Sequence, residues 1–217
     1  MADATKPDIL IFCNGTVDGG LKKMKEKANV HQASYGVPGE PSSLLQRFST
    51  ARAIWIVDPD ITLPQHHELS RQVVEYVKNG GGIVIMGGFF SSFVQPDDMD
   101  HWLGSSWGMP WMIGQYERTT VILQDSHVGL EASTRALLPT SYSSNILFLK
   151  NVLPSDSLYA SPHGARSELI ISGPVPVKAE TAVAFGKCGQ GWLGYTGDVN
   201  NESETAEVVL AMMGLLD

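Results

Sequence analysis

The sequence predicts an α/β fold in three layers, built on a mainly parallel central sheet. Residues 8–13, 53–57 and 83–86 are short, continuously apolar runs. Strands that are buried on both faces of a parallel sheet read in this way. A helical pattern joins the second run to the third within about 35 residues, a length typical of a βαβ unit. These two strands are therefore expected to be parallel neighbours.

Sequence signals predict both the helix of this unit and the positions of its two ends. Its apolar residues recur at steps of three and four, which gives one apolar face: Leu69, Val73, Tyr76 and Val77. Pro64 suits the first turn, where a missing N–H costs no hydrogen bond. Residues 80–82 are all glycine and end the helix, because glycine accepts the left-handed conformation found there.

The other elements rest on shorter signals. Helices are expected at 21–29, 42–48 and 202–216, and Asp97 or Asp98 is expected to cap a short helix that runs to Trp102. Further strand candidates are 30–34, 119–123, 146–149 and 169–172. Residues 181–185 and 192–196 read as a hairpin whose turn contains Cys188. Residues 95–111 have no regular pattern.

Composition limits the classes of function. The chain has 217 residues, a net charge of -8 and a pI near 5.2, so we expect one domain over 1–217 and no nucleic-acid partner. No apolar run reaches membrane-spanning length, and no membrane partner is expected. The two cysteines, Cys13 and Cys188, and the lack of a secretory signal favour a reduced, cytoplasmic protein.

A ligand crevice is expected where the carboxyl ends of the strands meet, because open α/β sheets bind their ligands there. The loop 14–20 follows the first strand, and two aspartates follow the second. A glycine turn follows the third strand, and polar residues follow the late strand. The residues expected to line this crevice are Asn14, Gly15, Asp58, Asp60, Gly87, Gly88, Phe89, Ser91, Ser92, Asp198 and Asn200.

The turn 87–92 has the shape of a nucleophile elbow, in which glycines let a side chain project above the sheet. It offers Gly88 and Phe89, and neither is a nucleophile. Ser91 and Ser92 have two interpretations. They are nucleophiles or anion ligands at a helix N-terminus, or they cap that helix.

These motifs resemble the class I glutamine amidotransferase-like fold, and within it the ThuA-like proteins of trehalose utilisation. The matching features are the glycines that end the helix, the glycine turn after an apolar strand, and a late hairpin with Gly189, Gly191, Tyr195 and Thr196. The resemblance implies a flavodoxin-like arrangement of the sheet. Catalytic members carry a cysteine on the elbow and His-Pro-Glu after the late strand. Gly88 or Phe89 and Asp198 stand at those places, so the resemblance implies no glutaminase activity.

Other candidate residues have two interpretations each. Asp58, Asp60 and Asp198 form an acidic cluster for a hydroxyl-rich ligand or a metal, or they bond to their own backbone. The aromatic residues between Phe89 and Trp111 line a pocket, or they pack in the core. The six histidines show no metal-binding spacing, so neither a metal nor a cofactor is expected. Cys13 is expected to be buried and Cys188 to be exposed in its turn.

Two functional hypotheses follow. The first is a small-molecule or carbohydrate-related binding domain that forms a homo-oligomer and has lost glutaminase chemistry. The second is an enzyme of unfamiliar, hydrolase-like type that uses crevice carboxylates such as Asp58 and Asp198. An open cavity at the elbow on which polar side chains converge favours a ligand site, whereas a cavity filled by Phe89 and Phe90 leaves a catalytically silent domain with a role in assembly.

Overall fold

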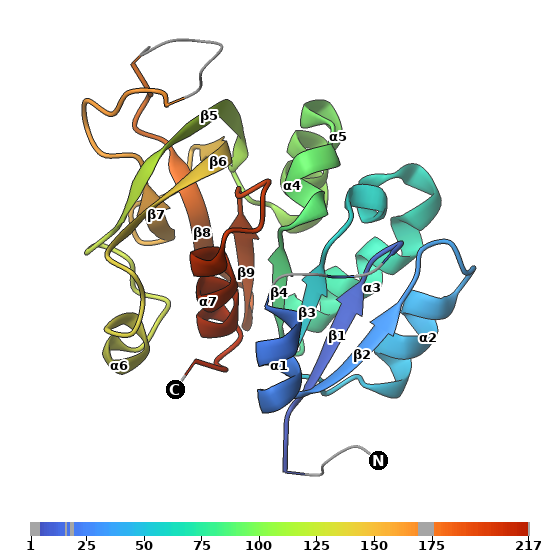
Figure 1. Ribbon diagram of the computed structural model, residues 1–217. Helices are drawn as coiled ribbons and strands as arrows, with labels where there is room; N and C mark the ends of the chain where they lie inside the picture. Colours follow the sequence, from blue (N-terminus) through green and yellow to red (C-terminus); the bar gives the residue numbers. More distant parts are fainter. Residues whose placement is uncertain (1–4, 16, 18–19, 169–175, 217) are drawn as a thin grey trace.

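The computed structural model describes residues 5–15, 17, 20–168 and 176–216. Within these residues, nine strands form one sheet in the order β2-β1-β3-β4-β9-β8-β6-β5-β7 (Figure 1). The strands are β1 (Asp8–Phe12), β2 (Asn29–Ala33), β3 (Ala53–Ile56), β4 (Ile83–Met86), β5 (Met112–Leu123), β6 (Ser141–Lys150), β7 (Ser157–Ala160), β8 (Thr181–Cys188) and β9 (Gly191–Thr196).

The first five strands in this order are parallel to one another: β2, β1, β3, β4 and β9. β1 pairs with β2 and β3, β3 pairs with β4, and β4 pairs with β9. Every residue of β3 is buried, as are the last four of β1 and the last three of β4. The prediction that the three apolar runs lie side by side in one sheet is confirmed, and burial on both faces explains their continuous apolar character.

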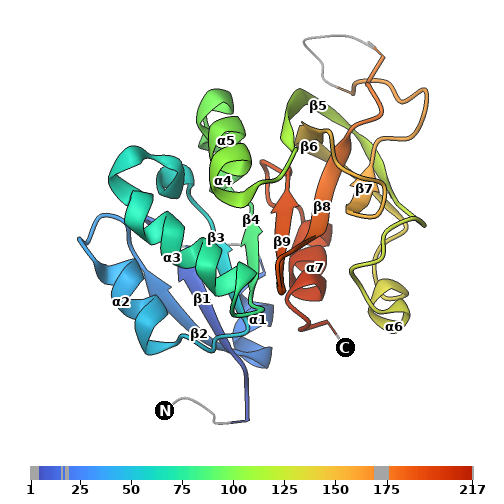
Figure 2. The same cartoon turned by 180° about the vertical axis from the view of Figure 1, so that it is seen from behind.

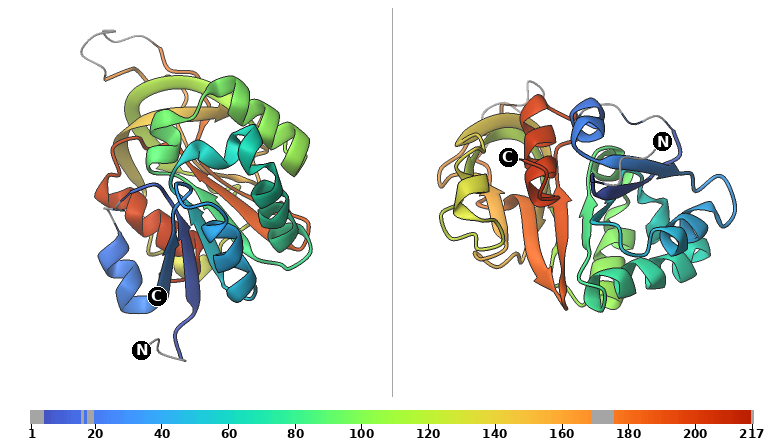
Figure 3. Two further views of the ribbon diagram at one scale, coloured as in Figure 1. Left: turned by 90° about the vertical axis from the view of Figure 1, so that its right-hand side faces the viewer. Right: turned by 90° about the horizontal axis from the view of Figure 1, so that it is seen from below.

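Helices cover both faces of this parallel half. The helices are α1 (Leu21–Lys27), α2 (Glu40–Arg47), α3 (His67–Lys78), α4 (Phe89–Phe93), α5 (Pro96–Trp102), α6 (Ala132–Arg135) and α7 (Ser203–Met212), with short turns η1 (Pro59–Thr62), η2 (Pro64–His66) and the π-helical η3 (Leu103–Trp107). Figures 2 and 3 show α1 and α7 on one face and α2 and α3 on the other. Leu10 and Phe12 pack toward α3, while Ile9 and Ile11 pack toward α7.

The predicted helix of the βαβ unit is present as α3, and a short 3-10 turn holds Pro64 just before it. Leu69, Val73, Tyr76 and Val77 all lie on its buried face. The Tyr76 hydroxyl donates to the Ala51 carbonyl at 2.8 Å. A Cβ on Gly82 would overlap the Tyr76 ring, so glycine at this position is required by the close approach of helix and chain.

The prediction of a three-layer, mainly parallel, flavodoxin-like sheet is wrong, because the other half of the sheet is antiparallel. β8 pairs antiparallel with β9, and the pairs β5–β6, β5–β7, β6–β8 and β7–β8 are antiparallel as well. Because β7 pairs with both β5 and β8, these strands close into a barrel-like ring. β5 and β6 are long and alternate between buried and open positions, so they leave only short apolar runs in the sequence.

Three smaller expectations have different outcomes. The short helix expected to run to Trp102 is present as α5, but its N-cap is Gln95, and Asp97 and Asp98 lie in its first turn. The rest of the stretch 95–111, which shows no pattern, contains the π-helical turn η3. The strand expected at 169–172 lies outside the described residues. Cys188 is the last residue of β8 and only 5% exposed, so the expectation that it lies exposed in the turn is wrong. Within the described ranges, no helix is long and apolar enough to cross a membrane.

Candidate functional site

The residues predicted for the crevice do lie at the ends of β1, β3, β4 and β9, but they fall into three groups. Asn14, Gly15, Asp58 and Asp60 form the first group, after β1 and β3. The turn 87–92 after β4 forms the second, and Asp198 with Asn200 after β9 forms the third. Each group has its own hydrogen-bond partners, and the cavity beside the elbow is lined by residues of the second group and not by Asn14, Asp58 or Asp198.

The turn after β4 depends on two glycines. Gly88 has φ 71° and ψ −129°, a backbone conformation that strains any other residue. A Cβ on Gly87 would overlap the Thr196 hydroxyl of β9. A Cβ on Gly88 would lie 3.4 Å from Val57 and from Asn201. The elbow-like turn is therefore present, and it is packed tightly against β3 and β9.

The two serines of this turn hold α4 onto the end of β9. The Ser91 hydroxyl donates to the Thr196 carbonyl at 2.6 Å and is buried. The Ser92 hydroxyl donates to the Val199 carbonyl at 3.1 Å. The N-cap of α4 is Gly88, which has no side chain, and both serine hydroxyls donate to carbonyls, so the capping interpretation is wrong. The Ser91 hydroxyl is also unsuited to be a nucleophile, because it is buried and already committed to a carbonyl.

The two phenylalanines of the turn point to different places. Phe90 is fully buried and packs against Trp102, with ring centroids 6.2 Å apart. Phe89 is 42% exposed and stands 6.0 Å from the Phe93 ring. Phe89 lines an open cavity of about 500 Å³ instead of filling it. The lining residues are Phe89, Ser91, Ser92, Phe93, Val94, Pro96, Tyr116, Leu147 and Val199.

The far wall of this cavity was not predicted from the sequence. Tyr116 lies on β5 and Leu147 on β6, and the two are paired across the antiparallel ladder. Tyr116 is 48% exposed. The nearby tryptophans do not take part, because Trp102, Trp107 and Trp111 are almost completely buried in the core. The expectation of an aromatic-lined pocket therefore fits Phe89 but not the tryptophans.

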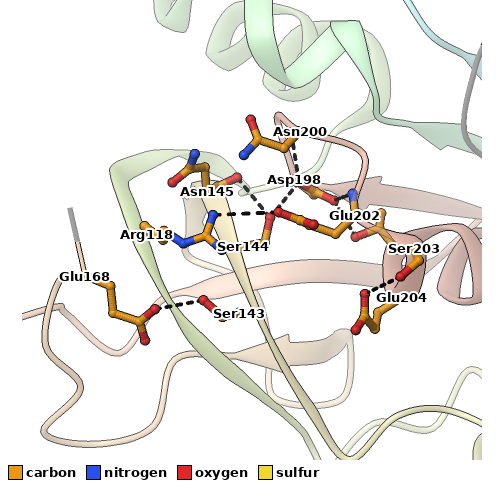
Figure 4. Close-up of polar contacts among 11 residues, drawn as sticks. Arg118, Ser143, Ser144, Asn145, Glu168, Asp198, Asn200, Glu202, Ser203 and Glu204 are labelled. Atoms are coloured by element: carbon orange, nitrogen blue, oxygen red, sulfur yellow. Dashed lines mark hydrogen bonds and ion pairs between the residues drawn. The ribbon is translucent and has the colours of Figure 1, made fainter. Parts of the chain in front are cut away.

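Asp198 belongs to a hydrogen-bond network that holds the two halves of the sheet together (Figure 4). Its carboxylate accepts from the Ser144 hydroxyl and the Thr205 hydroxyl, each at 2.6 Å. It also accepts from the backbone N–H groups of Asn200 and Glu202, at 2.9 and 2.6 Å. Asp198 is 3% exposed. With four donors bound and no open face, it connects β6 to the start of α7 and has no free acceptor to offer a ligand.

The loops after β1 and β3 are bonded to each other. The Asn14 N–H donates to Asp58 Oδ2 at 2.7 Å, and Asn14 Oδ1 accepts from the Gly36 N–H at 3.1 Å. Burial raises the pKa of Asp58, and the charge of Asp60 adds to that effect, against the hydrogen bond from Asn14. The predicted triplet with Asp198 is not formed. Within the described ranges, no three His, Cys, Asp or Glu residues are grouped so as to hold a metal.

Neither cysteine is activated. Burial raises the pKa of Cys13, whose thiol donates to the Gly15 carbonyl at 3.2 Å, and the negative charge of Asp58 raises it further. Burial also raises the pKa of Cys188. A thiol becomes a nucleophile when its pKa is lowered, so both cysteines are in the wrong environment for that role.

Comparison with known proteins extends the description of the fold. No family model matches the chain, and no curated protein matches it in sequence. A cytoplasmic protein of Salmonella typhimurium superposes with a TM-score of 0.63 and 11% identity over 97% of this chain and 99% of that one. A protein described as ThuA-like from Bacteroides uniformis gives 0.59 and 11% identity, over 97% and 92% of the chains. A GMP synthase-type protein from Thermoplasma acidophilum gives 0.54 and 12% identity, over 97% and 94%.

At these identities the likeness concerns the fold. The resemblance inferred from the glycine turn and the late hairpin is confirmed by structures that cover nearly the whole chain. The molecule has the class I glutamine amidotransferase-like fold, and ThuA-like structures are among those it is similar to.

Proposed function

We propose that the protein is a binding domain for a small carbohydrate or a related polyol, held in the cavity beside the elbow. The observation that carries this proposal is that Phe89 leaves the elbow cavity open and, with Phe93 and Tyr116, lines it with aromatic rings. A sugar ring offers an apolar C–H face and a rim of hydroxyls. Aromatic rings with a polar edge match that pattern.

The size and composition of the cavity support a small ligand. About 500 Å³ falls in the range of small-molecule sites. The apolar part comes from Phe89, Phe93 and Leu147, and the lining residues that carry a hydroxyl are Tyr116, Ser91 and Ser92. No Lys, Arg, Asp or Glu is among the lining residues. A neutral ligand is therefore favoured over a charged one.

Absence of glutaminase activity is part of the proposal. The elbow has Gly88 and Phe89 where an active enzyme has a cysteine, and both cysteines of the chain are buried, with raised pKa values. Incubation with glutamine should release no ammonia above the buffer rate. Release that a Cys13→Ala or Cys188→Ala variant abolishes would contradict this part.

The alternative is an enzyme that uses crevice carboxylates, and the structure does not bring its two carboxylates together. It needs Asp58 and Asp198 to act on one ligand. Asp198 is saturated by four donors on the side of β6 and α7, whereas Asp58 is bonded to the loop after β1. The geometry therefore favours binding over hydrolysis.

Calorimetric titration with methyl glucoside and cellobiose tests the proposal. Phe89→Ala and Tyr116→Ala should each weaken binding about tenfold, because each removes one aromatic wall. Met112→Ala is the matched control, since Met112 is equally exposed but does not line the cavity. Absence of binding at millimolar concentration, or an equal loss in the control, would refute the proposal. The predicted homo-oligomer remains a separate proposal, which light scattering of the purified chain would measure.

A further inference from the structure

A second cavity, of about 520 Å³, lies between α3, α5 and the turns η1, η2 and η3. Its volume lies in the range of small-molecule sites, and it shares no lining residue with the elbow cavity. η3 is π-helical, a form that occurs frequently at functional sites. The lining residues that carry a hydroxyl or an imidazole are Thr62, His67, Ser70, His101, Ser105 and Ser106.

The buried part of this lining is held by a hydrogen bond between two of its side chains. Trp102 Nε1 donates to Ser70 Oγ at 2.6 Å, and the two residues are 3% and 4% exposed. A serine hydroxyl both accepts and donates, so Ser70 keeps its own proton for a ligand. The hydroxyls of Thr62 and Ser105 instead donate to backbone carbonyls. The cavity thus has a fixed inner side that still offers a donor.

Two helices each bring one histidine to the same cavity. His67 is the first residue of α3, and His101 lies in the last turn of α5. Both residues are exposed, so their side chains are accessible to a ligand. Among the residues that the structure describes, no carboxylate lies within ion-pair distance of either imidazole. Each imidazole carries at least one N–H donor in either protonation state.

The charges around the cavity favour an anion. Although the chain has 23 acidic and 15 basic residues, none of the described residues that line this cavity is an Asp or a Glu. Glu68, next to His67 in the sequence, is bonded to Arg71 at 2.6 Å and lines a different cavity. The Lys78 ammonium donates to the Ser106 carbonyl at 3.1 Å, and no carboxylate of the described chain pairs with it. An anion in the cavity therefore meets a positive charge behind η3 and no negative charge in the described lining.

We propose that this cavity binds the anionic group of a small molecule, either a carboxylate or a phosphate. His67, His101, Ser70 and Ser106 offer N–H and O–H donors, and hydrogen bonds to an ionised acceptor are stronger than those to a neutral one. A cation is disfavoured, since no carboxylate of the described lining balances it. A metal ion is a poorer match, since the described residues hold no group of three or more His, Cys, Asp or Glu that could bind one. This site does not depend on the elbow cavity.

Calorimetric titration of the full chain with succinate and with inorganic phosphate tests the proposal, and succinamide is the neutral probe of the same length. One or both anions should bind, and succinamide should not; the tighter anion identifies the group as a carboxylate or a phosphate. His67→Ala and His101→Ala should each weaken anion binding at least tenfold, as expected for a lost hydrogen bond to a charged group. His66→Ala is the matched control, because His66 is adjacent in sequence but lines a different cavity.

A pair of variants at Ser106 separates charge from shape. Ser106→Asp and Ser106→Asn introduce side chains of nearly the same size, of which only the first is charged. Ser106→Asp should weaken anion binding at least tenfold more than Ser106→Asn, because it places a carboxylate in the wall. Urea unfolding of both variants checks that they are folded.

Phe89→Ala should leave anion binding unchanged, so a failure of this proposal is distinguishable from a failure of the carbohydrate proposal. Equal binding of succinate and succinamide, or no binding of either anion at millimolar concentration, would overturn the anion site. An equal loss in His66→Ala, or equal affinities in the two Ser106 variants, would overturn it as well.

Discussion

The parallel and antiparallel halves of the sheet bury their strands in different ways. Each of the four residues of β3 is buried, because helices cover both faces of the parallel half. β5 has 12 residues, of which Ile113, Thr119 and Val121 are buried. Its other positions face the surface or the edge of the ring. The strands β3 and β5 are thus supported by very different amounts of burial.

The two halves of the sheet also contribute different parts of the cavity beside the elbow. The parallel half supplies short loops at one edge, and these carry Gly88, Phe89 and Asp58. The antiparallel half supplies an outer wall, with Tyr116 and Leu147 facing the turn from β5 and β6. The cavity is lined by residues of both halves, because the turn after β4 and Val199 after β9 lie beside Tyr116 and Leu147. Neither half alone would enclose it.

Truncating one isoleucine in each half should give the largest contrast. Ile54 on β3 is fully buried, whereas Ile122 on β5 is 38% exposed. We expect Ile54→Ala to cost about 3 to 4 kcal/mol and Ile122→Ala less than about 1 kcal/mol, because only the first leaves a closed cavity. Urea unfolding measures both. Equal losses would show that the ring buries its strands better than the exposures indicate.

The second largest loss of stability is expected when the Asp198 network, which links the two halves, is removed. Asp198→Ala removes the acceptor for four donors and leaves the Ser144 and Thr205 hydroxyls buried. We expect a loss of about 3 kcal/mol in the free energy of unfolding. Asn200→Ala is the control, since its backbone N–H makes the contact and remains. Two separate unfolding transitions in Asp198→Ala would sharpen the comparison, while an unchanged midpoint would remove Asp198 from the link.

His127 should make the stability of the antiparallel half depend on pH. It is 4% exposed, its Nε2 lies 3.1 Å from the Phe185 carbonyl, and burial lowers its pKa. The imidazole of the unfolded chain has a pKa of about 6.5, so as the pH falls it is protonated before the imidazole of the folded protein. Stability is therefore complete above that pH and is lost as the pH falls below it. Thermal unfolding between about pH 7.5 and 5 should show this fall.

The variant His127→Gln should flatten that profile, because its amide can still donate to Phe185 but does not titrate. His163→Gln, at an exposed position, should not change the profile. A parent protein whose stability is the same at both ends of the range would contradict the role given to His127.

The smallest effects are expected where α4 is held to β9. Ser91→Ala removes a buried bond to the Thr196 carbonyl and should cost about 1 kcal/mol. Ser92→Ala removes a more exposed bond to Val199 and should cost about 0.5 kcal/mol. Urea unfolding resolves the first. Weaker sugar binding without loss of stability in Ser91→Ala would indicate that this hydroxyl faces the ligand instead.

Much of the parallel half could be predicted from local pattern. The apolar runs of β1, β3 and β4, the helix of the βαβ unit and the hairpin of β8 and β9 lie where the sequence places them. Doubly buried strands and glycine-ended helices leave continuous marks over a few neighbouring residues. The glycine elbow could be predicted for the same reason. The direction of β5 to β7 could not, because alternating strands carry a weak signal and their pairing joins residues far apart in the chain.

The roles of individual polar residues could not be predicted either. Ser91, Ser92 and Asp198 all stand at the expected edge, yet their partners come from β9, β6 and α7. Tyr116 was missed because nothing beside it in the sequence indicates a site. The amino-acid sequence by itself determined the strands, the turn and the absence of a cysteine on it. The tertiary structure alone decided which polar groups are satisfied and which remain open, since hydrogen-bond partners and burial arise only when distant segments pack together.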